Sequence, residues 1–298
     1  MQSSILTLLL AAIPAVLAQD EVTSTVWVDA ATSTGEVYDW SANWNPDIQI
    51  HSSCNRTQYT QIYKGWKESQ QLAAQARDHT SRYGNSSDIY RKYFGDAPTA
   101  EVIGWYDNIV NQDKTGVLFR CDNPDKNCDN EGWAGHWRGE NGTDETVICD
   151  LSYTSRRYLS QMCAYGYEVS KFSNALFWAS DILHRVWHTE ILGQLTVDHY
   201  ADTYDECLEL AQSSPEEAVR NSATLRYYAL EVYAYDVALP GVGCSGDDDW
   251  EEHAHDHDHS GESSASAEAT ASEKSESATT TVTGTECHTH ANGDVHCS

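Results

Sequence analysis

The abrupt change of composition after Gly246 is the strongest constraint on how this chain of 298 residues can fold. From about residue 51 to residue 244 the sequence is rich in Tyr and Trp, and it is long enough to bury a core. From Ser260 to Gly284 it consists almost entirely of Ser, Ala, Thr and Glu. Such a segment cannot bury enough apolar surface to offset the entropy of ordering its backbone. The sequence therefore predicts one globular domain followed by a disordered stalk.

The start of the chain indicates secretion. An apolar run from Ile5 to Leu17 is followed by Ala18, where small residues suit cleavage by signal peptidase. The run is too short to span a bilayer comfortably. The predicted organisation is a signal peptide, an extended segment, a globular domain, an acidic Ser/Ala/Thr-rich stalk with a His cluster, and a Cys/His loop. These regions cover residues 1–18, 19–50, 51–244, 245–286 and 287–298.

The nine cysteines also fit an oxidising compartment. No two of them form a CxxC motif, so we expect disulfides and not thiolate zinc sites. Because their number is odd, one is left over, and Cys207 is our candidate because it lies in a strongly helical stretch. The eight predicted to form disulfides are Cys54, Cys121, Cys128, Cys149, Cys163, Cys244, Cys287 and Cys297, with the last two expected to pair. Three N-glycosylation sequons begin at Asn55, Asn85 and Asn141.

The charge balance indicates which classes of binding partner the chain can have. The chain carries 46 acidic and 18 basic residues, a formal net charge of −28. Such a chain is repelled by nucleic acid and by anionic membranes, and it attracts cations.

The apolar periodicity of the domain predicts a helix-dominant α+β fold with a small sheet. Strands are expected over 117–121 and 146–149, joined by a Gly- and Asn-rich loop. Helices are expected over 57–83, 87–94, 99–111, 174–191, 196–212 and 214–237, with Thr196 as an N-cap and Ser214-Pro215 opening the last.

One motif concentrates the chemistry. His184 and His188 are four residues apart on a predicted helix, so both imidazoles share one face and can bind one Zn²⁺. Metalloproteases carry this pattern as HExxH, in which the Glu is the general base. Here that position is Arg185, whose guanidinium stays protonated and cannot serve as a base. Its positive charge should repel Zn²⁺ unless Arg185 turns away to a carboxylate such as Asp181 or Glu190.

A third ligand must come from elsewhere in the chain. The following segment offers His199 first and Asp202 second, because imidazole is the commoner zinc ligand. Glu231 is a more distant alternative. Glu190 and Glu231 are also the carboxylates that could replace the missing base. His51, His79 and His136 are expected to be structural or surface residues.

The tail carries a second set of histidines. In an extended chain alternate residues share a side, so an alternation of His with Ala or Asp can line imidazoles along one edge. A disulfide between Cys287 and Cys297 would confine three more in a small loop. The predicted tail ligands are His253, His255, His257, His259, His288, His290 and His296. Because imidazole binds metal only when neutral, with an ordinary pKa near 6.5, capture by the tail should weaken in acid.

Several motifs together resemble the fungal pH-regulated antigen, or zincophore, family, which includes zinc- and pH-regulated surface proteins of yeast and a fibrinogen-binding Aspergillus allergen. They are Ile50–Asn55, Ile89–Gly95, Val117–Pro124, Gly135–Gly139, the HRxxH of His184–His188, Pro240–Cys244 and the closing Cys287–His290. The resemblance implies a domain related to the zincin metalloproteases. It assigns His184 and His188 to the family's HRxxH motif and the last three histidines to its C-terminal zinc motif.

The resemblance also implies a function. A secreted protein of this kind would bind zinc outside the cell and deliver it to a fungal surface zinc transporter, either released or retained non-covalently at the cell wall. It further implies allergenicity and binding of host fibrinogen or complement regulators. Two alternatives stay open: a secreted zinc metallopeptidase with an atypical general base, and a surface interaction protein or adhesin with a structural metal site.

Overall fold

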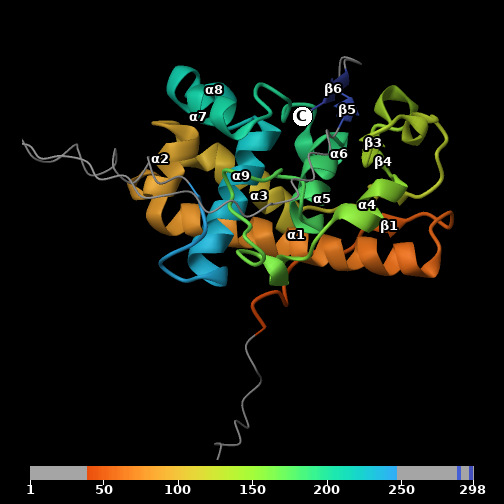
Figure 1. The fold of residues 1–298 in the computed structure, drawn as a ribbon, viewed down its shortest axis with the longest axis horizontal. Coiled ribbons are helices and arrows are strands. Elements are labelled where there is room, and N and C mark those ends of the chain that lie inside the picture. Colours follow the sequence, from red (N-terminus) through yellow and green to blue (C-terminus); the bar gives the residue numbers. More distant parts are fainter. Residues whose placement is uncertain (1–38, 247–286, 290–294, 298) are drawn as a thin grey trace, which may run out of the picture. The chain divides into compact units, whose positions relative to one another are not determined.

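A computed structural model describes residues 39–246, 287–289 and 295–297 (Figure 1). The chain divides into two compact units, Met1–Ala42 and Asn43–Ser298. In the first unit residues 39–42 form a turn, in which the Ala42 N–H donates to the carbonyl of Asp39. The predicted signal peptide (1–18) and the stalk from residue 247 onward lie outside the described residues. All that follows concerns the second unit.

The second unit is helix-dominant with a small sheet, which confirms the predicted fold class. The α-helices are α1 (Arg56–Tyr83), α2 (Asp88–Phe94), α3 (Thr99–Asn111), α4 (Asp150–Ser155), α5 (Trp178–Trp187), α6 (Glu190–Gly193), α7 (Tyr204–Ser213), α8 (Pro215–Ala218) and α9 (Ser222–Tyr233). Short 3₁₀ turns are η1 (Gly84–Ser86), η2 (Asn127–Asp129), η3 (Gly139–Asn141) and η4 (Leu159–Gln161), and η5 (Ala234–Ala238) is a π-helical turn. Among the described residues, no helix combines the length and the apolar character needed to cross a bilayer.

The sheet has four strands in the order β1-β2-β4-β3. They are β1 (Gln49–Ile50), β2 (Leu118–Arg120), β4 (Glu145–Ile148) and β3 (Gly135–Trp137). The first three are parallel, and β3 pairs antiparallel with β4 at the edge, where His136 lies opposite Val147. The sequence predicted β2 and β4 but placed β3 in a loop. Three residues, of which one is Gly, leave no alternation to detect.

The domain begins earlier than residue 51. The side chains of Gln70 and Lys114 both donate to the carbonyl of Asn45, at 2.7 and 3.0 Å. The Trp66 indole donates to the carbonyl of Pro46 at 2.8 Å, and β1 adds an edge to the sheet. Residues 45–50, predicted to belong to the extended N-terminal segment, are therefore part of the folded domain.

Helix α1 is the support on which the site is built, and it packs against α3, α5 and α9. The Asn55 side chain caps its N-terminus in a capping box with Gln58. At Gly65 a Cβ would lie only 2.9 Å from Trp178 and Ile182 of α5, so the absent side chain allows the two helices to approach closely. Every residue of α5 is buried.

Three predicted helices differ from the structure. The helix expected over 174–191 is α5 followed by the short α6, because the chain leaves helical geometry after His188. The helix expected over 196–212 begins only at Tyr204, where Thr203 forms a capping box with Glu206. The helix expected to begin at 214 is interrupted between α8 and α9.

One backbone contact explains the second and third of these differences. Asp198 forms a bridge with Asn221, since its N–H donates to the carbonyl of Arg220 and its carbonyl accepts from Ser222. A residue paired in this way cannot continue a helix, and the same pairing interrupts the partner segment. Tertiary contact therefore overrides the local helical propensity of both segments.

The end of the chain forms a two-stranded sheet of its own, and its first strand, β5 (Cys287–Thr289), contacts the edge strand β3. β5 pairs antiparallel with β6 (Val295–Cys297), with Cys287 opposite Cys297 and His288 opposite His296 along the backbone. The sequence predicted a small loop closed by these two cysteines. The backbone register fits that closure, and the side chains lie outside what the structure describes.

Gly193 closes the turn that follows α5, and we predict that it tolerates no side chain. A Cβ at this position would lie 1.5 Å from the carbonyl oxygen of Trp187, so the backbone would have to move. Gly193→Ala should lower the free energy of unfolding by at least about 2 kcal/mol in denaturant titrations. The control is Gly104→Ala in the exposed part of α3, where nothing lies within 4 Å of the added methyl group. That change should stabilise the protein by about 0.5–1 kcal/mol, and a Gly193→Ala protein as stable as the wild type would contradict the assignment.

Candidate metal centre

Three histidines converge at the end of α5. His184 lies on the last turns of α5, His188 is its C-terminal cap, and His199 comes from the loop between α6 and α7. The Nε2 atom of His199 lies 3.1 Å from Nε2 of His184 and 2.9 Å from Nε2 of His188. His184 and His188 are 7% and 6% exposed, and the His199 side chain is 0% exposed. The structure thus brings together the two motif histidines and the residue that the sequence ranked first as third ligand.

The turn after α5 is what delivers His199 to this point. Gln194 and Leu195 both adopt left-handed conformations, with φ of 54° and 51°. Together with Gly193 they reverse the chain, so that the next segment returns alongside α5. The bridge between Asp198 and Asn221 then fixes the residue immediately before His199.

Asp202 orients His199 and does not join the three converging nitrogens. Its Oδ1 atom lies 2.7 Å from Nδ1 of His199. A carboxylate accepts, so Nδ1 carries the hydrogen and donates, which leaves the lone pair of His199 on Nε2. The sequence ranked Asp202 as the alternative third ligand, but the geometry gives it the carboxylate–histidine arrangement that typically supports a metal-binding imidazole.

The donor set fits Zn²⁺. Tetrahedral zinc with Zn–N distances of about 2.0–2.1 Å holds its nitrogen ligands about 3.3 Å apart. The spacings of 2.9 and 3.1 Å around His199 are close to that value. Three imidazoles from a helix and a returning loop also match one of the three-ligand sets that catalytic zinc sites use.

Arg185 binds the carboxylate of Asp181, which meets the condition that the sequence sets for a metal ion beside it. Its Nε and Nη2 atoms donate to the two carboxylate oxygens of Asp181 at 3.0 and 2.9 Å. Arg156 donates to the same carboxylate at 3.1 Å. Burial disfavours the charged form of Asp181, but the two guanidinium groups outweigh it and hold the pKa of Asp181 below its ordinary value. The sequence did not indicate a role for Arg156, because no local pattern connects it to Asp181, which lies 25 positions away.

The carboxylates proposed as substitute bases are placed elsewhere. Glu231 accepts from Lys92 at 2.9 Å and from the hydroxyl of Tyr93, inside the core. Glu190 is exposed at the start of α6. Neither carboxylate belongs to the group of ligand atoms that the three histidines form.

Comparison with known proteins agrees with this geometry. Residues 2–247 match the model of a family described as "HRXXH: Putative peptidase family". The chain belongs to the HRXXH family. This HRXXH protein is 56% identical over 227 residues to "pH-regulated antigen PRA1" of Candida albicans, which covers 76% of this chain and 75% of that protein. It is 55% identical over 210 residues to "Major allergen Asp f 2" of Aspergillus fumigatus, covering 70% and 68% of the two chains. These matches confirm the resemblance to the pH-regulated antigens.

A solved structure is more distantly similar. A zinc peptidase from Grifola frondosa aligns with 60% of this HRXXH protein and 97% of its own chain, with 15% identity and a TM-score of 0.45. A likeness at that level does not decide the fold, which follows from the elements described above.

The cysteines of this HRXXH protein are paired as three disulfides in the described domain: Cys54–Cys121, Cys128–Cys149 and Cys163–Cys244. Cys207 is the free cysteine among the described residues and is fully buried. Burial raises the pKa of its thiol to about 12, so it is a poor nucleophile.

Some of the remaining predicted sites lie among the described residues, and others lie outside them. The sequon residues Asn55, Asn85 and Asn141 are all exposed, which glycosylation requires, although glycosylation itself stays a prediction. Among the other histidines, His79 is buried and bonded to Asp236 and Ser87. The tail ligands His253, His255, His257, His259 and His290 lie outside the described residues, and His288 and His296 are described only as backbone.

We predict that the buried carboxylate of Asp181 is essential to the stability of the domain. Asp181→Asn removes the charge of the buried carboxylate that binds both Arg156 and Arg185, whose side chains are 1% and 7% exposed. Removing one partner of a buried ion pair costs about 3–5 kcal/mol. The control is Asp107→Asn, whose carboxylate is 47% exposed in its pair with Arg77 and should cost less than about 1 kcal/mol. Equal losses of unfolding free energy in the two variants would contradict the role given to Asp181.

Proposed function

We propose that this protein is an extracellular zinc-binding protein that scavenges zinc and delivers it to the surface of a fungal cell. The observation that carries the proposal is the convergence of three imidazole nitrogens. The Nε2 atoms of His184 and His188 both lie within hydrogen-bond distance of Nε2 of His199. In this proposal zinc is cargo. The three imidazoles bind it tightly, and Asp202 holds His199 in the tautomer that presents Nε2.

The charge of the protein supports cation capture. A net charge of −28 attracts divalent cations toward the molecule at long range. The histidine side chains of the centre are almost completely buried, which favours slow release from it. The His-rich tail, predicted from sequence alone, would supply a second group of sites that exchange zinc more quickly.

The remaining parts of the proposal rest on sequence and relatives. The printed names of the relatives, "pH-regulated antigen" and "Major allergen", fit a protein exposed outside the cell, and the predicted signal peptide fits secretion. Hand-over to a surface zinc transporter, non-covalent retention at the cell wall, and binding of host fibrinogen or complement regulators are expectations from the family resemblance.

Zinc titration of the mature protein tests the two groups of sites separately. At near-neutral pH, the variant His184→Ala/His188→Ala should lose one tight zinc equivalent, because two of three ligands are absent. A protein truncated after Gly246 should keep that tight site and lose most of the rapidly exchanging zinc. Isothermal calorimetry with a competing chelator measures both.

The control for this titration is His51→Ala, which removes a histidine that is hydrogen-bonded to Ser53 and does not belong to the three-histidine group. It should bind zinc as the wild type does. Failure of the full-length protein to bind zinc at micromolar concentration would overturn the proposal. The same conclusion would follow if the double variant bound as many tight equivalents as the wild type.

We further propose that the scaffold does not hydrolyse peptides by the ordinary zinc-protease mechanism. That mechanism needs a carboxylate in the position of Arg185, and Arg185 is bound to Asp181 instead. The family description as a peptidase makes a direct test worthwhile.

The test incubates the zinc-loaded wild type and His184→Ala with an unstructured protein substrate and follows cleavage by mass spectrometry. We expect equal, background-level cleavage by both. Cleavage by the wild type that is lost in His184→Ala would instead establish a peptidase with an unusual base.

A further inference from the structure

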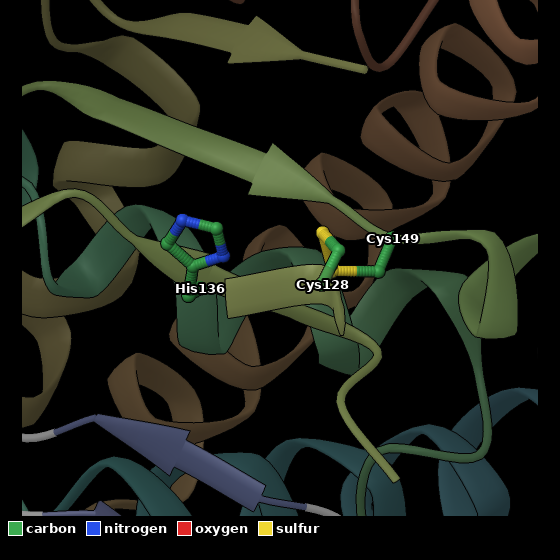
Figure 2. Close-up of side chains that lie close together, drawn as sticks. All are labelled: Cys128, His136 and Cys149. Carbon is green, nitrogen blue, oxygen red and sulfur yellow. A yellow bond between two sulfur atoms is a disulfide. The ribbon is translucent and has the colours of Figure 1, made fainter. Parts of the chain in front are cut away.

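A second group of metal-ligating side chains lies at the edge strand β3. One ring nitrogen of His136 and the sulfur atoms of Cys128 and Cys149 all lie within 4.8 Å of one another. Cys128 belongs to the turn η2, His136 to β3, and Cys149 follows β4 and precedes α4. In this structure the two sulfurs form a disulfide, so they are not available as ligands. Figure 2 shows the imidazole beside that bridge.

The ring of His136 is held in a defined orientation. Its Nε2 atom lies 3.3 Å from Oδ2 of Asp125, and Arg138 fixes this carboxylate with bonds of 2.8 and 3.1 Å. Because a carboxylate accepts, Nε2 carries the hydrogen and Nδ1 carries the lone pair. A carboxylate behind the far nitrogen of an imidazole is the arrangement that supports a metal ligand.

The lone pair of His136 has no partner among the described residues. Nδ1 is a buried atom without a hydrogen bond, and the side chain is 0% exposed. In Figure 2 the nitrogen next to the ring carbon that carries the side chain, Nδ1, is the one on the side of the bridge. A buried nitrogen that forms no hydrogen bond carries a desolvation cost, which a ligand at this point would remove.

His136 is also in the protonation state that a metal ligand needs. Burial lowers the pKa of its imidazole below the ordinary value, although the bond to Asp125 opposes this effect, and the charges of Arg185 and Arg138 add to it. The lowered pKa favours the neutral form of the ring, which is the form that binds a metal ion.

We propose that reduction of the Cys128–Cys149 disulfide opens a second metal site, in which both sulfurs and Nδ1 of His136 bind a thiophilic d¹⁰ cation such as Zn²⁺. A dithiol reductant supplies two electrons and two protons, which break the S–S bond, yield two thiols and leave the reductant as its own disulfide. Binding of Zn²⁺ then releases the two thiol protons, so that two thiolates and one imidazole hold the ion. The chain provides three ligands to it.

The surrounding backbone would keep the two sulfurs in place after reduction. The N–H of Cys149 donates to the carbonyl of Ala134 at 2.9 Å, which continues the pairing of β4 with β3. Cys128 is held through its N–H, which donates to the side chain of Asn123 at 3.1 Å. Cys149 is buried and Cys128 is only half-buried, so Cys128 presents the sulfur that a reductant would attack.

This site is distinct from the three-histidine centre. Gly135 and Trp137 lie on one face of β3 and contact α5, at Arg185 and at His188. His136 alternates to the other face, as neighbouring residues of a strand do. The two sites share β3 but no ligand, and the inference does not depend on the function proposed for the three histidines.

Cobalt spectroscopy tests the proposal, because a thiolate bound to Co²⁺ gives an intense near-ultraviolet charge-transfer band that histidine ligands do not give. The mature protein is reduced anaerobically with a phosphine under native conditions, and mass spectrometry after alkylation verifies that Cys128 and Cys149 are thiols. Addition of Co²⁺ should produce the band only after reduction. Zn²⁺ should abolish the band and slow alkylation of both cysteines.

Two variants make the test specific. His136→Gln retains a nitrogen donor for Asp125 but removes the Nδ1 lone pair, and it should weaken Co²⁺ binding at least about tenfold by analogy with lost ligand support. Cys128→Ser/Cys149→Ser keeps the other cysteines and should show no band. The proposal is overturned if the reduced wild type, with both thiols verified, gives no band. It is equally overturned if either variant binds Co²⁺ with the band and affinity of the wild type.

Discussion

The carboxylate of Asp181 is the group on which the arrangement of the metal centre depends. It lies inside the protein and accepts from both Arg156 and Arg185. Removing one partner of such a buried ion pair is strongly destabilising, so Asp181 holds both guanidinium groups in place. Because Asp181, Arg185 and the two motif histidines occupy neighbouring stripes of α5, the ion cluster fixes the rotation of the helix. That rotation in turn directs His184 and His188 toward His199.

The same cluster explains why Arg185 is compatible with a nearby metal ion. A guanidinium directed at the three histidines would repel a divalent cation. The bidentate contact with Asp181 offsets the positive charge of Arg185. Gly135 leaves space for the guanidinium group, since a Cβ at position 135 would lie 2.2 Å from the Arg185 side chain. A carboxylate at position 185 would instead face Asp181 at close range. Introducing the HExxH pattern into this helix would therefore require changes at several positions.

Sequence reasoning was strongest where the decisive contacts are local. The i, i+4 spacing identified His184 and His188, and the pair Asp181–Arg185 follows from the same spacing. His199 was chosen by chemistry alone, since nothing in the sequence indicates the left-handed turn at Gln194 and Leu195 that places it. The mistaken helix over 196–212 has the same origin: Asp198 pairs with Asn221, twenty-three residues away, and no propensity scale detects such a contact.

The absence of CxxC motifs led to the expectation of disulfides and not thiolate zinc sites, and the six cysteines of the described domain that were expected to pair do form three disulfides. Spacing rules cannot show, however, which of these pairs has a further potential ligand beside it. Metal-binding motifs record ligands that are close in sequence, whereas Cys128 and Cys149 are separated by 21 positions and are brought together by η2 and the β3–β4 pair. His136 seemed structural because it stands alone in its segment. Its environment in the fold is what singles it out: one nitrogen is oriented by Asp125, and the other is buried beside the bridge without a partner among the described residues. A cysteine pair that is stabilising when oxidised can therefore be a ligand pair when reduced. Only the three-dimensional arrangement distinguishes Cys128–Cys149 from the other two disulfides of the described domain.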